Sequence, residues 1–349
     1  MMGATGDTAS RGQAAEHAGA APAAPGSMGI LVRAPGGPEV LEWSPLETGT
    51  PRPGEVLIAQ RAVGLNFIDM YFRSGLYPWP VSPLIPGGEA AGVVESVGAG
   101  VTGFTPGDHV AYVAPFGAYR QRRILEAGRL VLLPAALSFE VAASIMLKGL
   151  TVQYLVTACF PVAAGHTVLV HAAAGGVGSL LGQWLSLIGA TAIGTVGSAD
   201  KVPVAQANGY AHVINYRADD FAARVREITG ARGCDVVYDS VGQDTWRGSL
   251  QCLKRRGTFV SFGQSSGAIA DFKLADLGGG GSLFATRPTL FDYIATPEEL
   301  RIRADDLFGK VVAGDLGVTV AQRWPLERAA DAHRALAARQ TTGASVLVP

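Results

Sequence analysis

The stretch TVLVHAAAGGVGSLLGQWLSLIGATAIGTVGSADK, residues 167–201, decides the fold of this chain. It opens with the apolar run Val168–Val170 and continues through a turn of alanine and glycine, residues 172–178. A helical segment then runs to Gly189, a residue type that closes helices in the left-handed conformation. The β-rich run Ala192–Val196 follows. This order of strand, glycine turn, helix and strand predicts a βαβ unit.

The turn of this unit has the pattern A-x-x-G-x-x-G, formed by Ala172, Gly175 and Gly178. Glycines at such a turn let a pyrophosphate reach the backbone N–H groups at the helix N-terminus, because no Cβ stands in the way. The alternative is a tight connection without a ligand, but the flanking strands and helix favour a nucleotide. We therefore predict a dinucleotide site whose backbone contacts are Ala174, Gly175, Gly176, Val177 and Gly178.

Composition excludes several classes of protein. The 349 residues suffice for two domains, charged residues are only 16% of the chain, and the net charge is -1. That balance gives no electrostatic footprint for nucleic acid or an anionic membrane, and no apolar run reaches the length that spans a bilayer. Three widely spaced cysteines follow no zinc or redox pattern and fit a reducing cytoplasm. Residues 1–27 lack any periodic pattern, and we expect a disordered tail.

Short β-type runs separated by Gly and Pro turns follow the tail. They predict a compact β-barrel-like domain with one helix near Asn66–Arg73. The runs are Gly29–Val32, Glu55–Val63, Ala91–Val97 and His109–Val113. A helix over Phe139–Leu155, with Ser138 as its N-cap, leads into the βαβ unit.

After Thr167, strands and helices alternate, which predicts a parallel sheet with helices on both faces, a doubly wound α/β fold. The expected strands after the βαβ unit are His212–Asn215, Asp235–Tyr238, Thr258–Phe262 and Leu283–Thr286. From about Leu290 we expect helix up to a final strand, Ala344–Val348. That strand cannot easily extend the parallel sheet, so we expect it to return to the first domain.

Several unusual strings cover nearly the whole chain after the tail. They are NFIDMYFRSGLYP (66–78), GGEAAGVVESVGAGV (87–101), LKGLTVQYL (147–155), HAAAGGVGSL (171–180), VINYR (213–217), VVYDSVGQDTW (236–246), RRGTFVSFGQSSG (255–267) and SLFATRP (282–288). In these strings the chain resembles the medium-chain dehydrogenase/reductase superfamily and, within it, the zeta-crystallin-like, NADPH-dependent quinone oxidoreductases.

The resemblance implies a GroES-like β-barrel catalytic domain and a Rossmann nucleotide-binding domain. We place the first at 28–149 and 289–349 and the second at 150–288. It also implies a homodimer that joins the edge strands near SLFATRP, residues 282–288.

Zinc ligands are missing where zinc-dependent relatives carry them. The corresponding positions read Gly64-Leu65-Asn66 and Gly87-Gly88-Glu89, and no cysteine precedes Cys159. His109 and His171 read as turn or strand-end residues. Four soft or imidazole ligands for a tetrahedral zinc cannot be gathered. A zinc-free site favours quinones and conjugated carbonyls, which spread added charge over their own π-system, over alcohols that need a Lewis acid.

The end of the second strand favours NADPH over NADH. An NAD-preferring domain usually ends this strand with an acid that binds the ribose 2′-hydroxyl, whereas here it ends Thr195-Val196-Gly197-Ser198. Lys201 adds a cation and Ser198 a hydroxyl; Lys201 alone would also suit a solvated helix face. Tyr216 matches the family's third contact to the 2′-phosphate. Asp200 and Pro203 oppose this prediction, by charge and by strain in the early helix.

The resemblance places Asn66 and Tyr71 beside the nicotinamide and the substrate. Tyr71 would donate to a quinone oxygen as charge develops there, and Asn66 would hydrogen-bond a ribose hydroxyl or the substrate; both also suit a polar pair at a helix start. Tyr77 and Trp79 suggest an aromatic wall for a flat ring, or plain packing. The chain offers no Ser-Tyr-Lys or His-Asp relay, which leaves solvent as the proton source.

Further cofactor contacts follow from the resemblance and from strand ends. Lys148 and Thr151 resemble positions that line the nicotinamide cleft, and Arg287 matches a family contact to the cofactor. Residues after strand ends lie where parallel sheets bind ligands; here they are Ser240, Phe262, Gly263 and Ser265.

The leading hypothesis is therefore an enzyme that reduces quinones with NADPH. The first alternative is reduction of a conjugated C=C bond in enones, enals or enoyl thioesters; a thioester carrier would need a cationic lip, for which Arg120, Arg122 and Arg123 are candidates. An alternative of another class is a single-stranded nucleic-acid-binding or structural protein, as among zeta-crystallins. The near-neutral charge argues against nucleic acid.

Overall fold

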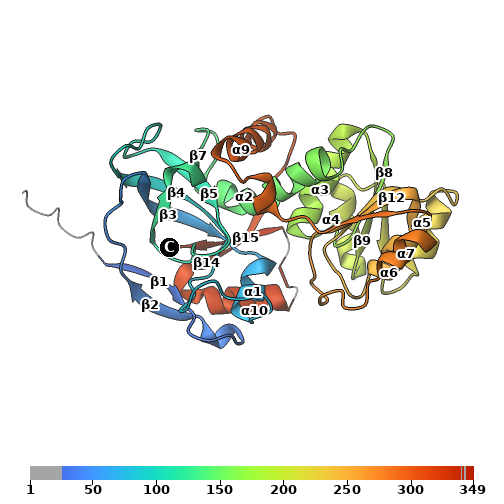
Figure 1. Cartoon of the computed structure of the whole chain (residues 1–349), viewed down its shortest axis with the longest axis horizontal. Coiled ribbons are helices and arrows are strands. Elements are labelled where there is room, and N and C mark those ends of the chain that lie inside the picture. Colours follow the sequence, from blue (N-terminus) through green and yellow to red (C-terminus); the bar gives the residue numbers. More distant parts are fainter. Residues whose placement is uncertain (1–25, 339, 342) are drawn as a thin grey trace, which may run out of the picture.

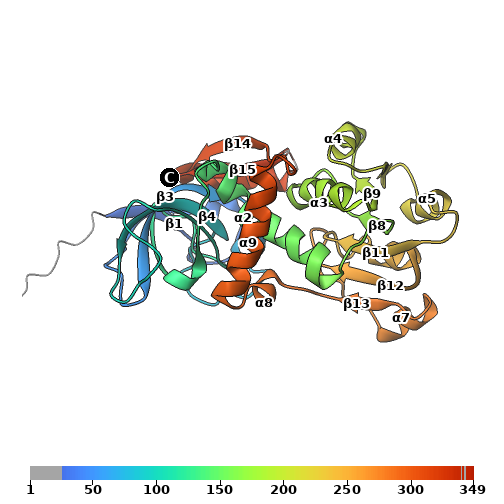
Figure 2. The ribbon, with the colours of Figure 1, turned by 90° about the horizontal axis from the view of Figure 1, so that it is seen from above.

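A computed structural model of the chain describes residues 26–338, 340, 341 and 343–349. Two lobes lie side by side, with helices α2 (Phe139–Tyr154) and α9 (Pro297–Val312) between them (Figures 1 and 2). Of the predicted tail, residues 1–27, residues 1–25 lie outside the described part of the chain. Ser27 already belongs to the first strand, so the predicted tail extends too far at its end.

The first lobe is a mostly antiparallel, barrel-like sheet. Its order is β14-β15-β3-β4-β5-β7, and β6 pairs with β3. Irregular register in β3, between Leu57 and Ile58 and between Gln60 and Ala62, bends this strand. Its strands are β3 (Glu55–Gly64), β4 (Glu89–Val97), β5 (His109–Val113), β6 (Arg122–Glu126), β7 (Leu130–Leu132), β14 (Val320–Pro325) and β15 (Ala344–Val348). A second, two-stranded sheet joins β1 (Ser27–Leu31) to β2 (Glu42–Leu46).

The second lobe is a six-stranded sheet in which every neighbouring pair is parallel. Its order is β10-β9-β8-β11-β12-β13, which in chain order is the 3-2-1-4-5-6 arrangement of dinucleotide-binding domains. The predicted doubly wound fold is confirmed. The strands are β8 (Thr167–Val170), β9 (Thr191–Val196), β10 (His212–Asn215), β11 (Cys234–Asp239), β12 (Leu253–Ser261) and β13 (Phe284–Thr286). All lie within 150–288, although the predicted domain limits themselves stay a prediction.

The other helices include the two that the sequence analysis marked by their ends. Asn66 precedes α1 and Gly189 closes α3 in the left-handed conformation, with φ 82°. The helices are α1 (Phe67–Arg73), α3 (Gly176–Ile188), α4 (Val202–Ala207), α5 (Phe221–Ile228), α6 (Trp246–Gln251), α7 (Leu274–Gly279), α8 (Leu290–Tyr293) and α10 (Ala329–Ala337). Short helical turns are η1 (Pro38–Val40), η2 (Ala127–Arg129), η4 (Ala199–Lys201), η5 (Leu326–Arg328) and the π-helical η3 (Leu155–Cys159).

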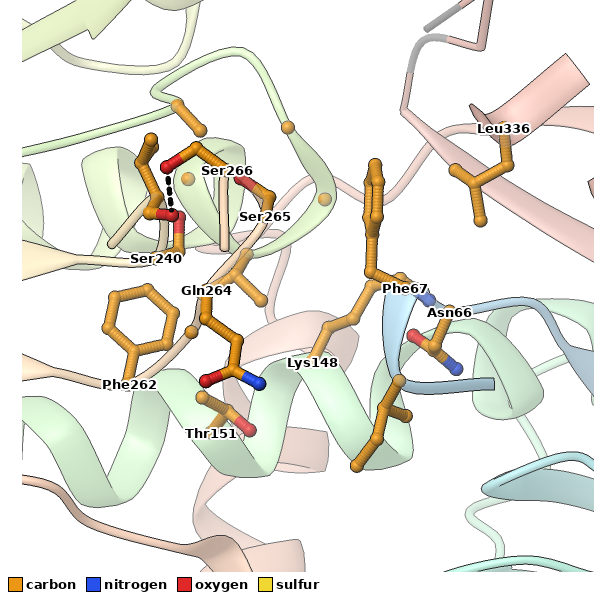
Figure 3. A pocket seen from close by; sticks show the side chains of 18 of the residues that line it. Asn66, Phe67, Lys148, Thr151, Ser240, Phe262, Gln264, Ser265, Ser266 and Leu336 are labelled. Atoms are coloured by element: carbon orange, nitrogen blue, oxygen red, sulfur yellow. Dashed lines mark hydrogen bonds between the residues drawn. The ribbon is translucent and has the colours of Figure 1, made fainter. Parts of the chain in front are cut away.

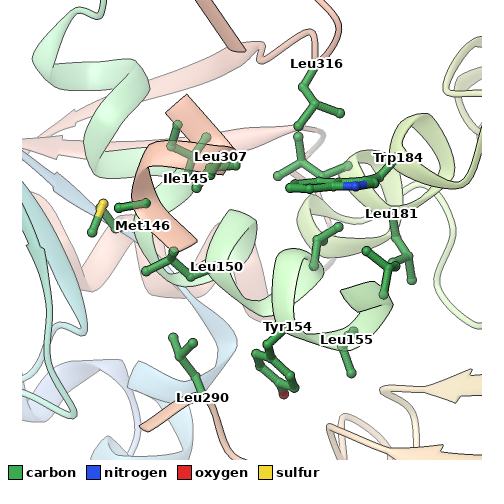
Figure 4. Packing of buried hydrophobic residues seen from close by; sticks show 14 of the residues in the cluster. Ile145, Met146, Leu150, Tyr154, Leu155, Leu181, Trp184, Leu290, Leu307 and Leu316 are labelled. Atoms are coloured by element: carbon green, nitrogen blue, oxygen red, sulfur yellow. The ribbon is translucent and has the colours of Figure 1, made fainter. Parts of the chain in front are cut away.

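Helix α2 connects the two lobes and packs into both. Its N-cap, Ser138, accepts a hydrogen bond from Val141 N at 3.3 Å, as the sequence predicts. Figure 4 shows Ile145, Met146 and Leu150 on this helix among buried side chains of α3 and α9. Because the helix is apolar on nearly every face, its place is the core.

The stretch Phe139–Cys159 is long and apolar enough, by length and composition alone, to cross a membrane. No apolar stretch of this length was expected from the sequence. In the structure 72% of the apolar window of this stretch is buried inside the protein, as in a core helix.

Two expectations for the last part of the chain had different outcomes. Strand β15 pairs with β3 of the first lobe, as predicted. The region before it is not wholly helical, because β14 pairs in parallel with β15. The segment VAQRWP of β14 alternates half-buried and exposed residues, so it has no fully apolar run that would have marked it as a strand.

Candidate active site

A cleft of about 1380 Å³ lies between the lobes. It receives residues from α1 and α2 on one side and from the carboxyl ends of the parallel strands on the other (Figure 3). The structure brings together here nearly every residue that the sequence analysis selected: Asn66, Tyr71, Tyr77, Lys148, Thr151, Ala174, Gly175, Gly176, Val177, Gly178, Ser198, Lys201, Tyr216, Ser240, Phe262, Gly263, Ser265 and Arg287. Trp79 is the exception. Its ring packs against the barrel core, and its Nε1 donates to Phe72 O at 2.6 Å.

The glycine turn is built for close backbone approach. A Cβ on Gly178 would stand 2.3 Å from Ala172 O, so a side chain has no room there. Ala172 itself takes a left-handed conformation, with φ 58°, at the position where the commoner fingerprint has glycine. The turn is held by hydrogen bonds from Gly175 N to Ala172 O and from Ala173 N to Thr195 O, both 2.9 Å. This cradle at the start of α3 fits a pyrophosphate.

The far end of the cleft is lined by the residues after β9 and β10. Ser198, Lys201 and Tyr216 meet there, and the tip of β9 carries no acid. Arg217, which the sequence analysis missed, lines the same end. It follows Tyr216 directly, so its place just after a predicted strand end was the signal in the sequence that could have found it. A hydroxyl, a phenol and two cations fit a 2′-phosphate.

The two features that opposed this phosphate site act differently. Pro203 lies in the first turn of α4, where a missing N–H leaves no bond unmade, so the expected strain is absent there. Asp200 does line the cleft. A hydrogen bond from Ser198 lowers the pKa of this exposed carboxyl, which keeps it anionic. Its charge stays beside Lys201.

At the other end, Asn66 belongs to a buried polar group. Its Nδ2 donates to Glu89 Oε1 at 2.8 Å, and Lys148 Nζ donates to the same oxygen at 3.1 Å. Glu89 Oε2 accepts from Leu147 N at 2.6 Å. The Asn66 side chain also forms the capping box at the start of α1 together with Asp69. In the sequence Glu89 stands out only as part of the Gly87-Gly88-Glu89 string, and its contacts with Asn66 and Lys148 were not predicted.

Tyr71 forms the aromatic side of this end. Its ring centroid lies 5.4 Å from that of Tyr77, with a tilted arrangement. Burial and the neighbouring Tyr77 raise the pKa of Tyr71 to about 12, against the opposing effects of the Gln264 backbone and Arg287. The phenol therefore remains protonated at neutral pH and serves as a hydrogen-bond donor.

The loops after β11 and β12 complete the opposite wall. Arg287 Nη1 donates to Ser261 O and to Gly263 O, both at 3.1 Å, and its Nη2 donates to Gln264 Oε1 at 3.2 Å. This arginine thus fixes the loop that carries Phe262, Gly263 and Ser265. On the α2 side, Thr151 Oγ1 donates to Leu147 O at 2.7 Å within its own helix.

The three arginines considered for a carrier phosphate have partners outside the cleft. Arg122 pairs with Glu95 at 2.8 Å. Arg123 donates to Phe116 O at 2.7 Å, and Arg120 donates to Glu47 O at 3.2 Å. They do not form a cationic lip.

The positions of the two candidate histidines do not suggest metal binding. His109 packs against Phe139 with ring centroids 4.6 Å apart, and His171 is buried between Thr195 and Ser249. Over the part of the chain that the structure describes, no three His, Cys, Asp or Glu side chains gather to hold a metal ion.

Comparisons with known proteins agree with this architecture. The family model of the alcohol dehydrogenase GroES-like domain matches residues 52–158, and that described as zinc-binding dehydrogenase matches residues 176–294. The chain belongs to the medium-chain dehydrogenase/reductase superfamily.

Within that superfamily the similarity is to quinone oxidoreductases. The chain is 50% identical over 321 residues to the quinone oxidoreductase of Pseudomonas aeruginosa, covering 92% of this chain and 99% of that one. It is 44% identical over 330 residues to a 2-haloacrylate reductase of a Burkholderia species, covering 92% and 99%. The crystal structure of Escherichia coli quinone oxidoreductase complexed with NADPH superposes with a TM-score of 0.89 at 46% identity, covering 92% of this chain and 100% of that one.

Proposed function

We propose that this protein is an NADPH-dependent quinone oxidoreductase. One observation carries the proposal: a single cleft joins an anion cradle and a cationic, acid-free strand end to an aromatic chamber with a phenolic donor. The relatives at 50% identity, named as quinone oxidoreductases, support the same substrate class.

In this proposal the nucleotide domain holds the cofactor along its strand ends. The backbone N–H groups of Gly175 to Gly178 face the pyrophosphate, and Ser198, Lys201, Tyr216 and Arg217 face the 2′-phosphate. When bound, NADPH supplies the hydride. Asn66, held by Glu89, and the loop held by Arg287 orient the nicotinamide end. Lys148, Thr151, Ser240, Phe262 and Ser265 line this part.

The barrel side orients the acceptor and stabilises its charge. Tyr71 donates a hydrogen bond to the quinone oxygen on which charge develops. Tyr77 and Phe67 give a flat ring apolar walls. Asparagine and glycine stand at the two positions where zinc-dependent relatives place a cysteine and a histidine, so this donor set suits acceptors that delocalise charge themselves rather than alcohols.

A second candidate is reduction of a conjugated C=C bond in a small enone, enal or acrylate. It is favoured by the 44% identity to a 2-haloacrylate reductase. An enoyl thioester is a weaker candidate, because Arg120, Arg122 and Arg123 are engaged elsewhere.

We further propose a cytoplasmic homodimer that pairs the β13 edges of two copies. Phe284 on that strand is 60% exposed and Leu274 on neighbouring α7 is 81% exposed, and such apolar surface at a strand edge suits a partner. Sedimentation of wild type and Phe284→Lys tests this, with a dimer expected for the first and a monomer for the second. A monomeric wild type contradicts it.

The function is tested by following NADPH oxidation with quinones, enones, acrylates and enoyl thioesters, and with NADH in place of NADPH. We expect quinones to give the highest kcat/KM, and NADPH to exceed NADH. Higher kcat/KM for acrylates or enones would favour the second candidate. A kcat/KM for NADH equal to that for NADPH would overturn the cofactor assignment.

A further inference from the structure

A chain of four buried polar side chains runs through the barrel beside the cleft. Arg73 Nη1 lies 3.1 Å from His333 Nδ1, His333 Nε2 lies 2.9 Å from the Tyr119 hydroxyl, and that hydroxyl lies 3.0 Å from Asp69 Oδ2. The exposed fractions of Asp69, Tyr119 and His333 are 1%, 0% and 0%. The proposed function uses none of these four residues.

The direction of each hydrogen bond follows from donor chemistry. An arginine can only donate, so His333 Nδ1 accepts, and the ring proton of a neutral imidazole must sit on Nε2. That proton is donated to the oxygen of Tyr119, which donates its own to Asp69 Oδ2. Burial and the Arg73 charge lower the pKa of His333 to about 3, so the ring is neutral at physiological pH.

The two oxygens of Asp69 therefore differ. Oδ2 accepts from Tyr119 and also from Asn66 N at 2.8 Å. Oδ1 is buried and has no hydrogen-bond partner among the described residues. A proton on this carboxyl consequently sits on Oδ1. Burial raises the pKa of Asp69 to about 7; the bonds from Asn66 N and Tyr119 oppose this, the charge of Glu89 raises it further and that of Lys148 lowers it.

Oδ1 faces a small space above Gly88. A Cβ built on Gly88 would lie 3.8 Å from Oδ1, 3.7 Å from Leu147 Cδ2 and 3.4 Å from Ala114 O. That is room for a methyl group. A water in the same space, displaced from the Cβ position towards the two oxygens, would have Oδ1 and Ala114 O as its polar partners. Leu147 and Pro115, the residue after Ala114, line the cleft. The space thus lies between the carboxyl and the cleft wall.

We propose that Asp69 is the proton source of the reaction, acting through one water held above Gly88 between Oδ1 and Ala114 O. This inference rests on the proposed quinone reduction. Reduction of a quinone to a hydroquinone takes up one hydride and one proton. The O–H bond of the Asp69 acid breaks, an O–H bond forms on the reduced quinone oxygen through the water, and the Asp69 carboxylate is protonated again from solvent.

The proton affinities of Tyr71, which lines the cleft, and of Asp69, which lies behind the cleft wall, support these two different roles. Tyr71, with a pKa of about 12, holds its proton and stabilises charge by hydrogen bonding. A group with a pKa near the working pH is the better proton donor, because it is both available as an acid and ready to release the proton. Asp69 meets that condition.

The first test is Asp69→Asn, in which the amide oxygen still accepts from Asn66 N and Tyr119 but the group cannot titrate. We expect kcat at pH 7 to fall about 100-fold, the dependence of kcat on pH around 7 to disappear, and NADPH affinity to stay the same. Asp108→Asn is the matched control: this aspartate accepts from Thr105 N at 2.7 Å in a turn of the same domain. It should behave as wild type.

Gly88→Ala is a second, independent variant that tests the proposal even if Asp69→Asn does not fold. Its Cβ would make only ordinary contacts, yet it fills the space of the water. We expect kcat to fall about as far, with an altered solvent deuterium isotope effect and an unchanged Asp69 carboxyl. Wild-type kcat and isotope effect in Gly88→Ala would overturn the water route.

An infrared difference spectrum of the cofactor-free protein, wild type minus Asp69→Asn, reads the acid directly. We expect a carboxylic acid band at about pH 5 that disappears as the pH rises through about 7. A missing band overturns the proposal. If the wild type reduces no quinone, the proposed function and the proton donation by Asp69 are both wrong. If the wild type is active but its kcat has the same pH dependence as that of Asp69→Asn, only the proton donation by Asp69 is wrong.

Discussion

Each lobe contains a buried carboxylate that is linked through a hydroxyl group to a buried histidine, Asp239 through Ser249 to His171 and Asp69 through Tyr119 to His333. The two clusters differ in how completely the carboxylate is hydrogen-bonded. In the nucleotide domain, Asp239 Oδ1 accepts from Val241 N and Gly242 N at 2.8 and 2.9 Å. Its Oδ2 accepts from Thr245 and Ser249 at 2.8 and 2.9 Å. In the barrel, Asp69 has two donors on one oxygen and none, among the described residues, on the other.

The two histidines follow the same division. His171 contacts Thr195 Oγ1 at 2.8 Å and Ser249 Oγ at 2.9 Å, and so ties β8 to β9 and α6. Burial lowers its pKa. His333 instead donates a hydrogen bond to the Tyr119 hydroxyl, which in turn donates to Asp69. The Asp239 carboxylate has both oxygens hydrogen-bonded and fixes the loop after β11. We propose that Asp69, whose Oδ1 has no partner among the described residues, exchanges a proton instead.

Removing the carboxylate of Asp239, both of whose oxygens are hydrogen-bonded, should have the largest effect on stability. Asp239→Ala leaves four donors without their acceptor in a buried place, and we expect the free energy of unfolding to fall by about 5 kcal/mol. Urea denaturation at neutral pH measures it, with the exposed Asp219→Ala as control. A loss below about 1 kcal/mol would show that this cluster does not stabilise the domain.

Replacing Asp69, whose Oδ1 has no hydrogen-bond partner among the described residues, should raise the free energy of unfolding at alkaline pH, whereas replacing Asp239 lowers it. The pKa of Asp69 is about 7 in the folded state against 3.8 for an ordinary Asp, so the folded state holds the proton more tightly. The contribution of Asp69 to stability is then highest below pH 4 and declines as the pH rises towards 7. At about 1.4 kcal/mol per pKa unit, Asp69→Asn should be more stable than wild type at pH 8 by on the order of 4 kcal/mol, and similar at pH 4. Urea denaturation of both proteins at pH 4 and pH 8 measures this difference. The same stability difference between wild type and Asp69→Asn at the two pH values would contradict the raised pKa.

A smaller effect is expected from the phenol of Tyr71, which lines the cleft and which we propose donates to the quinone. Tyr71→Phe keeps the ring and its contact with Tyr77 but removes the donor. We expect quinone kcat to fall about 10-fold, which corresponds to about 1.4 kcal/mol of transition-state stabilisation. The Kd for NADPH, measured by fluorescence titration, should not change. An unchanged kcat removes Tyr71 from the mechanism.

The smallest effect should come from one hydrogen bond of the complete cluster. Thr245→Val removes the bond to Asp239 Oδ2 at similar volume, and we expect a loss of about 1 kcal/mol in the free energy of unfolding. Thr191→Val, at an exposed position of β9, is the control. A loss as large as that of Asp239→Ala would mean that the cluster fails as a unit when any one bond is broken.

The sequence predicted those parts of the site that follow from local pattern. Gly178, Ser198 and Tyr216 each follow a recognisable strand end, and the parallel sheet then brings strand ends together. Glu89, Asp69 and Asp239 were missed, because their roles depend on partners distant in the chain: Glu89 meets Lys148, and Asp69 is linked through Tyr119 to His333. No local pattern marks such pairs.

Trp79 and β14 show the same limit for the fold. The aromatic composition around Tyr77 does not distinguish a ring that faces the cleft from one that packs on the barrel, and Trp79 does the latter. Strand β14 forms because β15 returns to the barrel and offers it an edge. A segment of alternating half-buried residues becomes a strand through that pairing rather than through its own propensity.

The left-handed alanine of the nucleotide turn has a consequence for the entropy of cofactor binding. Ala172 has φ 58°, a conformation that costs an alanine roughly 1–2 kcal/mol relative to its right-handed form. An unfolded chain with alanine at this position also samples fewer conformations than one with glycine. The strain is compensated by packing and hydrogen bonds formed during folding, so the amides of the turn are ordered before any ligand arrives. Binding to this turn should therefore proceed with little further loss of backbone freedom.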